Sequence, residues 1–148
     1  MKKIILIGVI AVFIMYPKVV YSCTCAAPLA PFEGATEIFT GKVIKIVRPL
    51  IEKLGIKKTY TNKVTFEVTK QWQGSASRSK VVTTRPYTES CGYPFEIGKE
   101  YFIVVFKERD IQTGICTGTK NVEDAEYEIQ QMDKFYEAST KQNKDLGG

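Results

Sequence analysis

The sequence contains no histidine among its 148 residues, and this absence excludes several kinds of catalytic site. A serine or cysteine nucleophile activated by histidine cannot be built, and neither can a metal site with imidazole ligands. The chain also lacks a glycine-rich phosphate loop, and its carboxylates are scattered along the sequence, where only folding could bring distant ones together as a catalytic pair. We therefore expect that the protein is not an enzyme and that it needs no cofactor.

Long apolar runs are also scarce, because only the beginning of the chain has one. Two lysines precede an apolar stretch over residues 4–16, which is the length of a signal-peptide core and short for a bilayer span. Pro17 then ends the helical pattern, and the residues before Cys23 suit a cleavage site. We expect residues 1–22 to be a signal peptide, which leaves a secreted mature chain without a membrane span. The alternatives are that this segment is a membrane anchor or a buried core helix.

The chain has no strong excess of positive charge once residues 1–22 are left out. Residues 1–22 hold three of the 21 lysines and arginines and none of the 16 acidic residues, so the other 126 residues carry 18 against 16. Phosphate recognition needs a concentrated basic surface. We therefore expect no nucleic-acid partner. One basic cluster remains, which we interpret as part of a solvated loop: Arg48, Lys53, Lys57, Lys58 and Lys63.

The four cysteines all follow the signal segment, at Cys23, Cys25, Cys91 and Cys116. An even number of cysteines in an exported chain predicts disulfides, here two of them. A four-cysteine zinc site would show two close Cys-x-x-Cys pairs, whereas Cys91 and Cys116 are far apart. Because Cys23 directly follows the cleavage site, a lipid anchor on Cys23 is the alternative to free secretion. Tyr21 is bulky for the acylation signal that such an anchor requires.

The rest of the chain shows mostly the period of two that predicts β-strands. The first expected strand contains Gly41, which indicates a bulge. The second alternates apolar and polar residues, as a half-buried strand does, and the fourth is apolar on both faces, as a strand covered on each side is. The expected strands cover residues 37–47, 60–73, 80–84, 101–106 and 111–117.

From Asn121 onward the apolar period lengthens to three and four residues, which predicts a helix with Asn121 as its N-cap. The apolar stripe consists of Val122, Ala125, Ile129, Met132 and Tyr136. We expect residues 23–140 to form one domain and 141–148 to be a flexible tail. The predicted fold class is mainly β: a five-stranded closed barrel with a C-terminal α-helix packed on it. We expect a monomer.

The Cys23-Thr24-Cys25 start is the unusual chemical element of the chain. Two disulfides would hold a terminus that normally frays. A free α-amino group titrates near physiological pH, so part of it is neutral there. The amine nitrogen and the carbonyl oxygen of Cys23 can then close a five-membered chelate ring on a metal ion. Catalytic zinc keeps one coordination position open for such a donor.

This start resembles that of the tissue inhibitors of metalloproteinases, in their N-terminal netrin-like domain. The resemblance covers roughly residues 23–125, and its most specific part is the Cys-x-Cys start combined with the downstream Ser-Cys-Gly-Tyr. Further segments similar to the family follow in the family's order, at residues 39–43, 64–74, 89–93, 98–101 and 113–116. The chain departs from the family in having no cysteines for the third disulfide of that domain.

The resemblance implies an OB-type five-stranded barrel with Cys23–Cys91 and Cys25–Cys116 disulfides. It also implies a zinc metalloprotease as partner: the Cys23 amine and carbonyl would bind the protease zinc, and Thr24 would enter the adjacent specificity pocket. The other protease contacts implied by the resemblance are Cys25, Ala26, Ala27, Glu89 and Ser90. The alternative function is an extracellular netrin-like module that binds another protein, a glycan or a surface ligand without inhibiting a protease.

Overall fold

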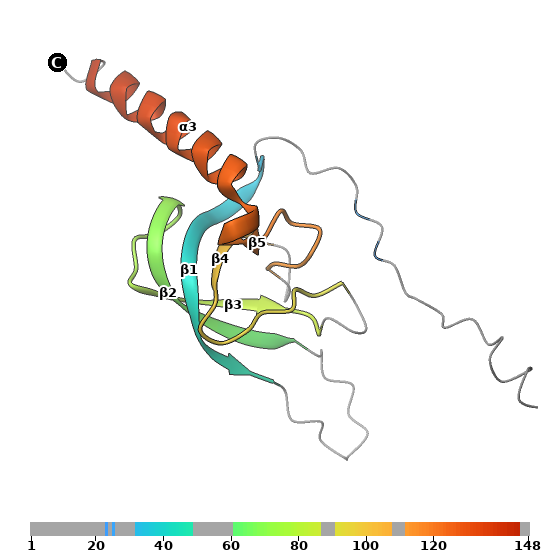
Figure 1. Cartoon of the computed structure of the whole chain (residues 1–148). Helices are drawn as coiled ribbons and strands as arrows, with labels where there is room; N and C mark the ends of the chain where they lie inside the picture. The colour runs from blue at the N-terminus through green and yellow to red at the C-terminus, as the bar shows by residue number, and fades with distance from the viewer. Residues whose placement is uncertain are drawn as a thin grey trace, which may run out of the picture.

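The structure is a computed structural model that describes Cys23, Cys25 and residues 32–48, 61–86, 91–107 and 112–145. The fold is mainly β with one C-terminal helix, as the sequence predicts (Figure 1). The elements are β1 (Ala35–Val47), β2 (Asn62–Gln73), β3 (Ser79–Thr84), β4 (Glu100–Phe106), β5 (Lys120–Asn121), the 3₁₀ turn η1 (Val122–Asp124) and α3 (Glu126–Asp145). The four longer strands lie in or close to the ranges that the sequence predicts. Lys63, which the sequence groups with the basic loop, belongs instead to β2.

The five strands form one antiparallel sheet in the order β3-β2-β1-β4-β5. Strand β1 is the centre of this sheet, because it pairs with β2 on one side and with β4 on the other (Figure 1). The register between β1 and β2 shifts between Thr40 and Gly41, which confirms the predicted bulge. A Cβ atom at Gly41 would lie 2.9 Å from the carbonyl oxygen of Glu67, so glycine permits the close approach of the two strands there.

The closed barrel is not confirmed, because no ladder of hydrogen bonds joins β3 to β5 within the described ranges. The edge of β3 instead meets a short segment that precedes β5. Thr84 and Thr113 form an isolated parallel bridge, and the backbone amides of Gln112 and Thr113 both donate to the carbonyl of Thr83, at 3.1 and 3.2 Å. This contact narrows the opening between the two edges of the sheet.

The predicted strand over residues 111–117 is wrong within its described part. Only Thr113 makes a β-bridge, and residues 115–118 form a turn. The physical reason is local: the hydroxyl of Thr117 donates to the carbonyl of Gly114 at 2.8 Å, and Gly118 has a φ of +86°. These groups satisfy one another within the turn and so compete with a sheet ladder. Strand β5 follows the turn.

Strand β4 separates two apolar clusters, which confirms the prediction of a strand covered on both sides. Tyr101, Ile103 and Val105 point to one side and Phe102 and Val104 to the other. On the first side they pack with Phe39, Val43, Val64, Phe66, Val82 and Phe95. On the second side the cluster is completed by Ala35, Ile38, Trp72, Ala125 and Met132. The second cluster therefore joins the sheet to the helix.

The helix begins later and ends later than the sequence predicts. Asn121 caps the 3₁₀ turn η1, where its side chain accepts a hydrogen bond from the amide of Glu123, and α3 begins only at Glu126. The helix then runs to Asp145, so it includes five residues of the predicted tail. Its beginning packs on the sheet, and its second half projects away from it (Figure 1). Tyr136, at the end of the predicted stripe, is consequently 53% exposed.

Candidate functional site: a disulfide-tethered Cys-x-Cys edge

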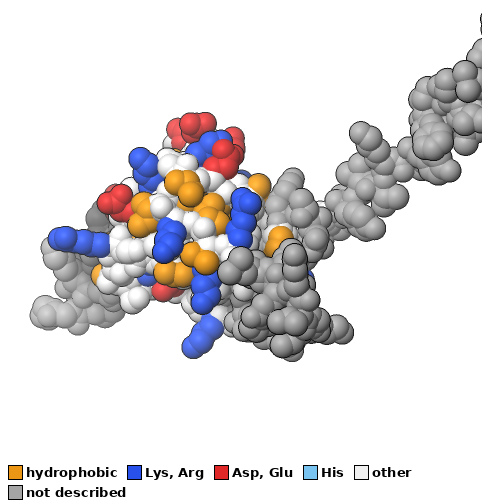
Figure 2. All heavy atoms as spheres, turned by 90° about the horizontal axis from the view of Figure 1, so that it is seen from below, with side chains coloured by type: hydrophobic (Ala, Val, Ile, Leu, Met, Phe, Trp, Pro, Cys, Tyr) orange, Lys and Arg blue, Asp and Glu red, His pale blue; other side chains and the backbone are white. Residues whose placement is uncertain are grey.

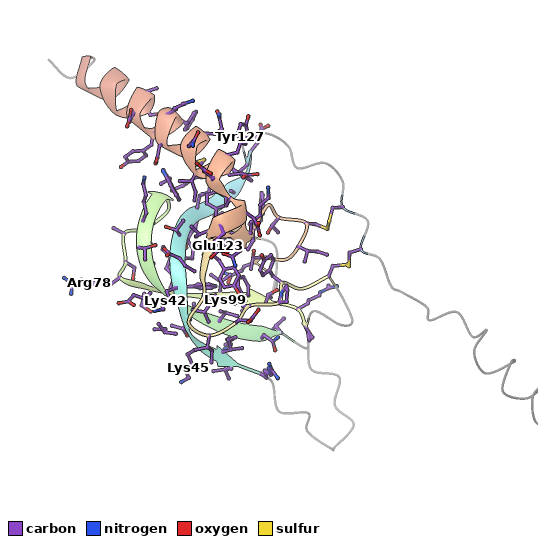
Figure 3. The ribbon with its side chains drawn as sticks, viewed as in Figure 1. Lys42, Lys45, Arg78, Lys99, Glu123 and Tyr127 are labelled. Carbon is purple, nitrogen blue, oxygen red and sulfur yellow. A yellow bond between two sulfur atoms is a disulfide. The ribbon has the colours of Figure 1, made fainter. Side chains whose placement is uncertain are left out.

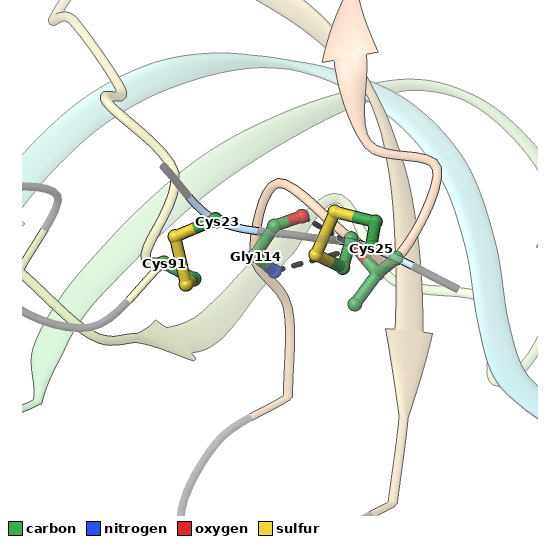
Figure 4. The surroundings of a disulfide bond; sticks show 6 residues. Cys23, Cys25, Cys91 and Gly114 are labelled. Carbon is green, nitrogen blue, oxygen red and sulfur yellow. Dashed lines mark hydrogen bonds between the residues drawn. A yellow bond between two sulfur atoms is a disulfide. The ribbon is translucent and has the colours of Figure 1, made fainter. Parts of the chain in front are cut away.

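Two disulfides attach the Cys-x-Cys segment to the sheet domain. They join Cys23 to Cys91 and Cys25 to Cys116, with Cα–Cα distances of 5.8 and 5.2 Å. This is the pairing that the family resemblance implies. The two bonds lie close together and bind two loops that are 25 residues apart in the sequence (Figure 4). The Cys-x-Cys segment is therefore held at two points on the same edge of the molecule.

The loop that carries Cys91 is fixed to the end of β3. The amide of Tyr93 donates a 3.0 Å hydrogen bond to Oγ1 of Thr84, a side chain that is almost fully buried. A Cβ atom at Gly92 would lie 1.6 Å from the carbonyl oxygen of Arg85, so the backbone of the loop rests directly on that strand end. Cys91 itself has a φ of +59°, a left-handed conformation that L-residues seldom adopt.

The loop that carries Cys116 is fixed to β4 through a cluster of threonine hydroxyls. Oγ1 of Thr113 lies 2.7 Å from Oγ1 of Thr119 and 3.0 Å from Oγ1 of Thr117. The amide of Val104, in the middle of β4, donates to the Thr119 hydroxyl at 3.1 Å. Because Thr113 and Thr119 are buried, these hydrogen bonds are shielded from water and hold the turn in a single arrangement.

The two loops also contact each other, which makes the edge one unit. The amide of Ile115 donates to the carbonyl of Cys91 at 3.2 Å. A Cβ atom at Gly114 would lie only 2.7 Å from the same oxygen, so glycine is needed for this approach. Cys23 and Cys25 are thus anchored to loops that are bonded to one another and to two different strands. Cys23 is half-buried and Cys25 is exposed.

The structure brings together only part of the predicted site. Cys23, Cys25, Cys91 and Cys116 meet at this edge. The other predicted contact residues lie outside the described residues and stay predictions: Thr24, Ala26, Ala27, Glu89 and Ser90. The threonine cluster was missed by the reasoning from sequence, although the dense threonine and glycine content around Cys116 was a signal of turn structure.

One titratable group close to this edge is the phenol of Tyr93, two residues after Cys91. Burial raises the pKa of Tyr93 above its usual range, and the nearby Tyr101 and Asp124 add to the effect. The phenol therefore stays neutral at physiological pH and acts as a packing group against Phe95 and Tyr101. Within the ranges that the structure describes, no group of three His, Cys, Asp or Glu residues is placed to hold a metal ion. No helix there is both long and apolar enough to cross a membrane.

The fold and this edge define a class: a small, mainly β domain whose N-terminal Cys-x-Cys segment is tethered by two disulfides. Neither protein-family models nor curated proteins give a match to the chain. The thiols of all four cysteines are consumed by these two disulfides.

Proposed function

We propose that this protein is secreted, that it is related to the tissue inhibitors of metalloproteinases, and that it inhibits a zinc metalloendopeptidase through the main chain of Cys23. The observation that carries the proposal is the double attachment of the Cys-Thr-Cys start. Both of its cysteines are bridged to loops that hydrogen bond to each other through Ile115 and Cys91. A main-chain ligand for a partner's metal needs this kind of rigid support, because ordering a loose terminus would reduce the affinity.

The proposed mechanism requires removal of residues 1–22, which turns the Cys23 nitrogen into a terminal amine. In its neutral form the amine has a lone pair, and together with the Cys23 carbonyl oxygen it would chelate the protease zinc and displace the water bound there. The Thr24 side chain would enter the specificity pocket beside the zinc. Cys25, Ala26, Glu89 and Ser90 would extend the contact along the protease cleft.

We also propose that the sheet closes into an OB-type barrel. The pairing of the β3 end with the segment before β5 supports this: Thr84 and Thr113 form a bridge, and the amides of Gln112 and Thr113 donate to the carbonyl of Thr83. We expect the amides of Gln112 and Thr113 to exchange hydrogen slowly, at rates comparable to those of the β4 amides. Rapid exchange at both positions would indicate an open sheet.

The decisive experiment compares the chain that begins at Cys23 with a chain that carries one additional alanine before Cys23. The extra residue converts the amine into an amide, which has no lone pair for zinc, and it leaves every described contact in place. We expect the authentic form to inhibit cleavage of a fluorogenic peptide by at least one of a panel of zinc endopeptidases, and the extended form not to inhibit it. Intact mass measurement of both proteins verifies the N-terminus and the two disulfides.

Matched thermal unfolding curves are the control for this comparison, because the extension should not change the stability of the fold. Equal inhibition by the two forms would show that the amine is not a zinc ligand. Absence of inhibition by both at micromolar concentration, with the amine shown to be free, would favour the alternative of a netrin-like binding module.

A further inference from the structure

A second surface, separate from the disulfide edge, combines exposed aliphatic side chains with lysines. We call it the outer β1–β3 face. It consists of the outward residues of three paired strands: Lys42, Ile44, Lys45 and Val47 of β1, Lys63, Thr65 and Glu67 of β2, and Ser79, Val81 and Thr83 of β3. Viewed from below, apolar and basic side chains are interspersed, and acidic side chains lie mainly toward the margin (Figure 2). Lys42 and Lys45 lie well away from the two disulfides (Figure 3).

The aliphatic part of this face results from an irregularity in β1. The register with β2 shifts between Val43 and Lys45, so Ile44 and Lys45 are both exposed although they are neighbours in the sequence. Ile44 is 49% exposed, Val47 is 46% exposed and Val81 is 56% exposed. Lys45, Thr65 and Val81 stand in one cross-strand row, and Val47 and Lys63 stand in the next. The exposed aliphatic side chains therefore lie on β1 and β3, and Thr65 and Lys63 of β2 stand between them, so the face mixes apolar and basic groups.

A turn next to β1 extends the aliphatic surface. The amide of Gly98 donates to the carbonyl of Val43 at 2.8 Å, and the amide of Val43 donates to the carbonyl of Lys99 at 2.9 Å. This turn carries Ile97, which is 66% exposed. A fourth large aliphatic side chain is therefore held beside the β1 segment that bears Ile44.

The described lysines differ in whether they form ion pairs. Among the described residues, ion pairs join Lys70 to Asp133, Lys80 to Glu37, Lys99 to Glu96 and Lys120 to Glu128. Lys45 and Lys63 form no ion pair with any described residue, and Lys42 stands between two acidic cross-strand neighbours, Glu67 on β2 and Glu100 on β4. Among the residues that the structure describes, no carboxylate neutralises the charge of Lys45 or Lys63.

The composition of the face distinguishes between kinds of anionic partner. Protein interfaces are rich in aromatic residues and poor in lysine, whereas this face has lysines and no aromatic residue among its members. A sulfated glycan would use the lysines and leave Ile44, Val47 and Val81 in water. An anionic lipid surface uses both, because aliphatic side chains enter the boundary of the acyl chains while lysines reach the headgroups.

We propose that the outer β1–β3 face binds peripherally to the surface of an anionic lipid bilayer. Ile44, Val81 and the adjacent Val47 insert at the headgroup level, and Lys45 and Lys63 contact the anionic headgroups. This contact is independent of the proposed protease inhibition, because it uses neither the disulfide edge nor the main chain of Cys23.

The test is co-sedimentation of the purified chain with vesicles of phosphatidylcholine alone and with vesicles that also contain phosphatidylglycerol. We expect binding to the mixed vesicles and much weaker binding to the neutral ones. Binding should fall as salt is raised, because the screening length shortens from about 10 Å at 0.1 M to about 3 Å at 1 M.

Two double variants separate the aliphatic and the basic contributions. Lys45→Gln with Lys63→Gln should weaken binding to the mixed vesicles by about 25-fold, at roughly fivefold for each lysine removed. Ile44→Ser with Val81→Ser should bind the mixed vesicles more weakly than the wild type does. This difference should persist at high salt, where the contribution of the lysines is screened. Wild type and variants share the same N-terminus, so residues 1–22 or a lipid on Cys23 cannot produce the difference between them.

The matched controls are Tyr127→Ser and Lys134→Gln, two exposed positions on α3 that should leave vesicle binding unchanged. Unchanged melting temperatures verify that the variants are folded. The proposal is overturned if the chain does not bind the mixed vesicles or if both double variants bind as the wild type does. Binding to heparin without binding to vesicles would also overturn it and would assign the face to a glycan.

Discussion

The link between the Cys91 loop and the sheet offers a direct test of how the tethered edge is held. Oγ1 of Thr84 accepts the 3.0 Å hydrogen bond from the amide of Tyr93, and only 1% of Thr84 is exposed. Thr84→Val keeps the volume and the branched shape that suits a strand, but it removes the acceptor. The Tyr93 amide is then left without its partner close to the apolar core.

The expected cost follows from this geometry. A buried donor that loses its acceptor destabilises a protein by about 1–3 kcal/mol. We expect the lower half of that range, about 1–2 kcal/mol, because Tyr93 is only half-buried and water can replace part of the lost bond. For a domain of this size the melting temperature should fall by about 3–8 °C.

The assay is equilibrium unfolding in guanidinium chloride with both disulfides intact, combined with hydrogen exchange of the Tyr93 amide. The matched control is Thr65→Val, a threonine on the exposed side of β2, which should change stability by less than about 0.5 kcal/mol. Exchange at Tyr93 should accelerate in Thr84→Val and not in Thr65→Val. Equal stability of the two variants, or unchanged exchange at Tyr93, would refute the role given to this hydrogen bond.

Three further predictions concern the helix contact, the core and the proposed inhibitory edge. Lys70 and the indole of Trp72 donate hydrogen bonds to Asp133, and these bonds lower the pKa of its carboxyl. The ionised carboxyl therefore stabilises the fold at any pH above the pKa that Asp133 has in the unfolded chain. This stabilisation is lost as the pH falls through the lower pKa of the folded state. Because the Asp133 side chain is 36% exposed, its contribution to stability should be below about 1 kcal/mol. The measurement is the difference in unfolding free energy between wild type and Asp133→Asn, which should be present at neutral pH and disappear in acid. A difference that stays constant over this pH range would contradict the prediction. Phe66→Ala should cost about 3–5 kcal/mol in chemical unfolding, because Phe66 is fully buried and makes edge-to-face contacts with Phe39 and Phe95, whereas Tyr127→Ala on the helix surface should be nearly neutral. Thr24→Gly should weaken inhibition of the sensitive protease without lowering the melting temperature, and a large loss of melting temperature would instead make Thr24 a structural residue.

Several features of this protein are determined by short-range patterns and could be predicted from the sequence alone. The four longer strands follow from their apolar and β-branched residues, which alternate with polar ones in β2, and the two-sided burial of β4 follows from its unbroken apolar run. The bulge at Gly41 was predictable because glycine inside a strand pattern marks a close approach of backbones. The sequence alone therefore predicts a mainly β fold with one C-terminal helix, but it does not establish whether the sheet closes into a barrel.

Other features depend on contacts between residues that are distant in the sequence, and only the tertiary structure decides them. Residues 112–118 have a composition compatible with a strand, yet residues 115–118 form a turn closed by local hydrogen bonds. The tertiary structure decides where this turn docks, because the amide of Val104 in β4 donates to the hydroxyl of Thr119. Four cysteines permit three pairings, so composition alone does not choose between them. The exposure of both Ile44 and Lys45 also lies beyond any alternating pattern, because it arises from the register that β1 adopts against β2. The sequence thus determined where the four longer strands lie, whereas long-range hydrogen bonds and packing decided how their ends meet and which side chains the protein presents to its surroundings.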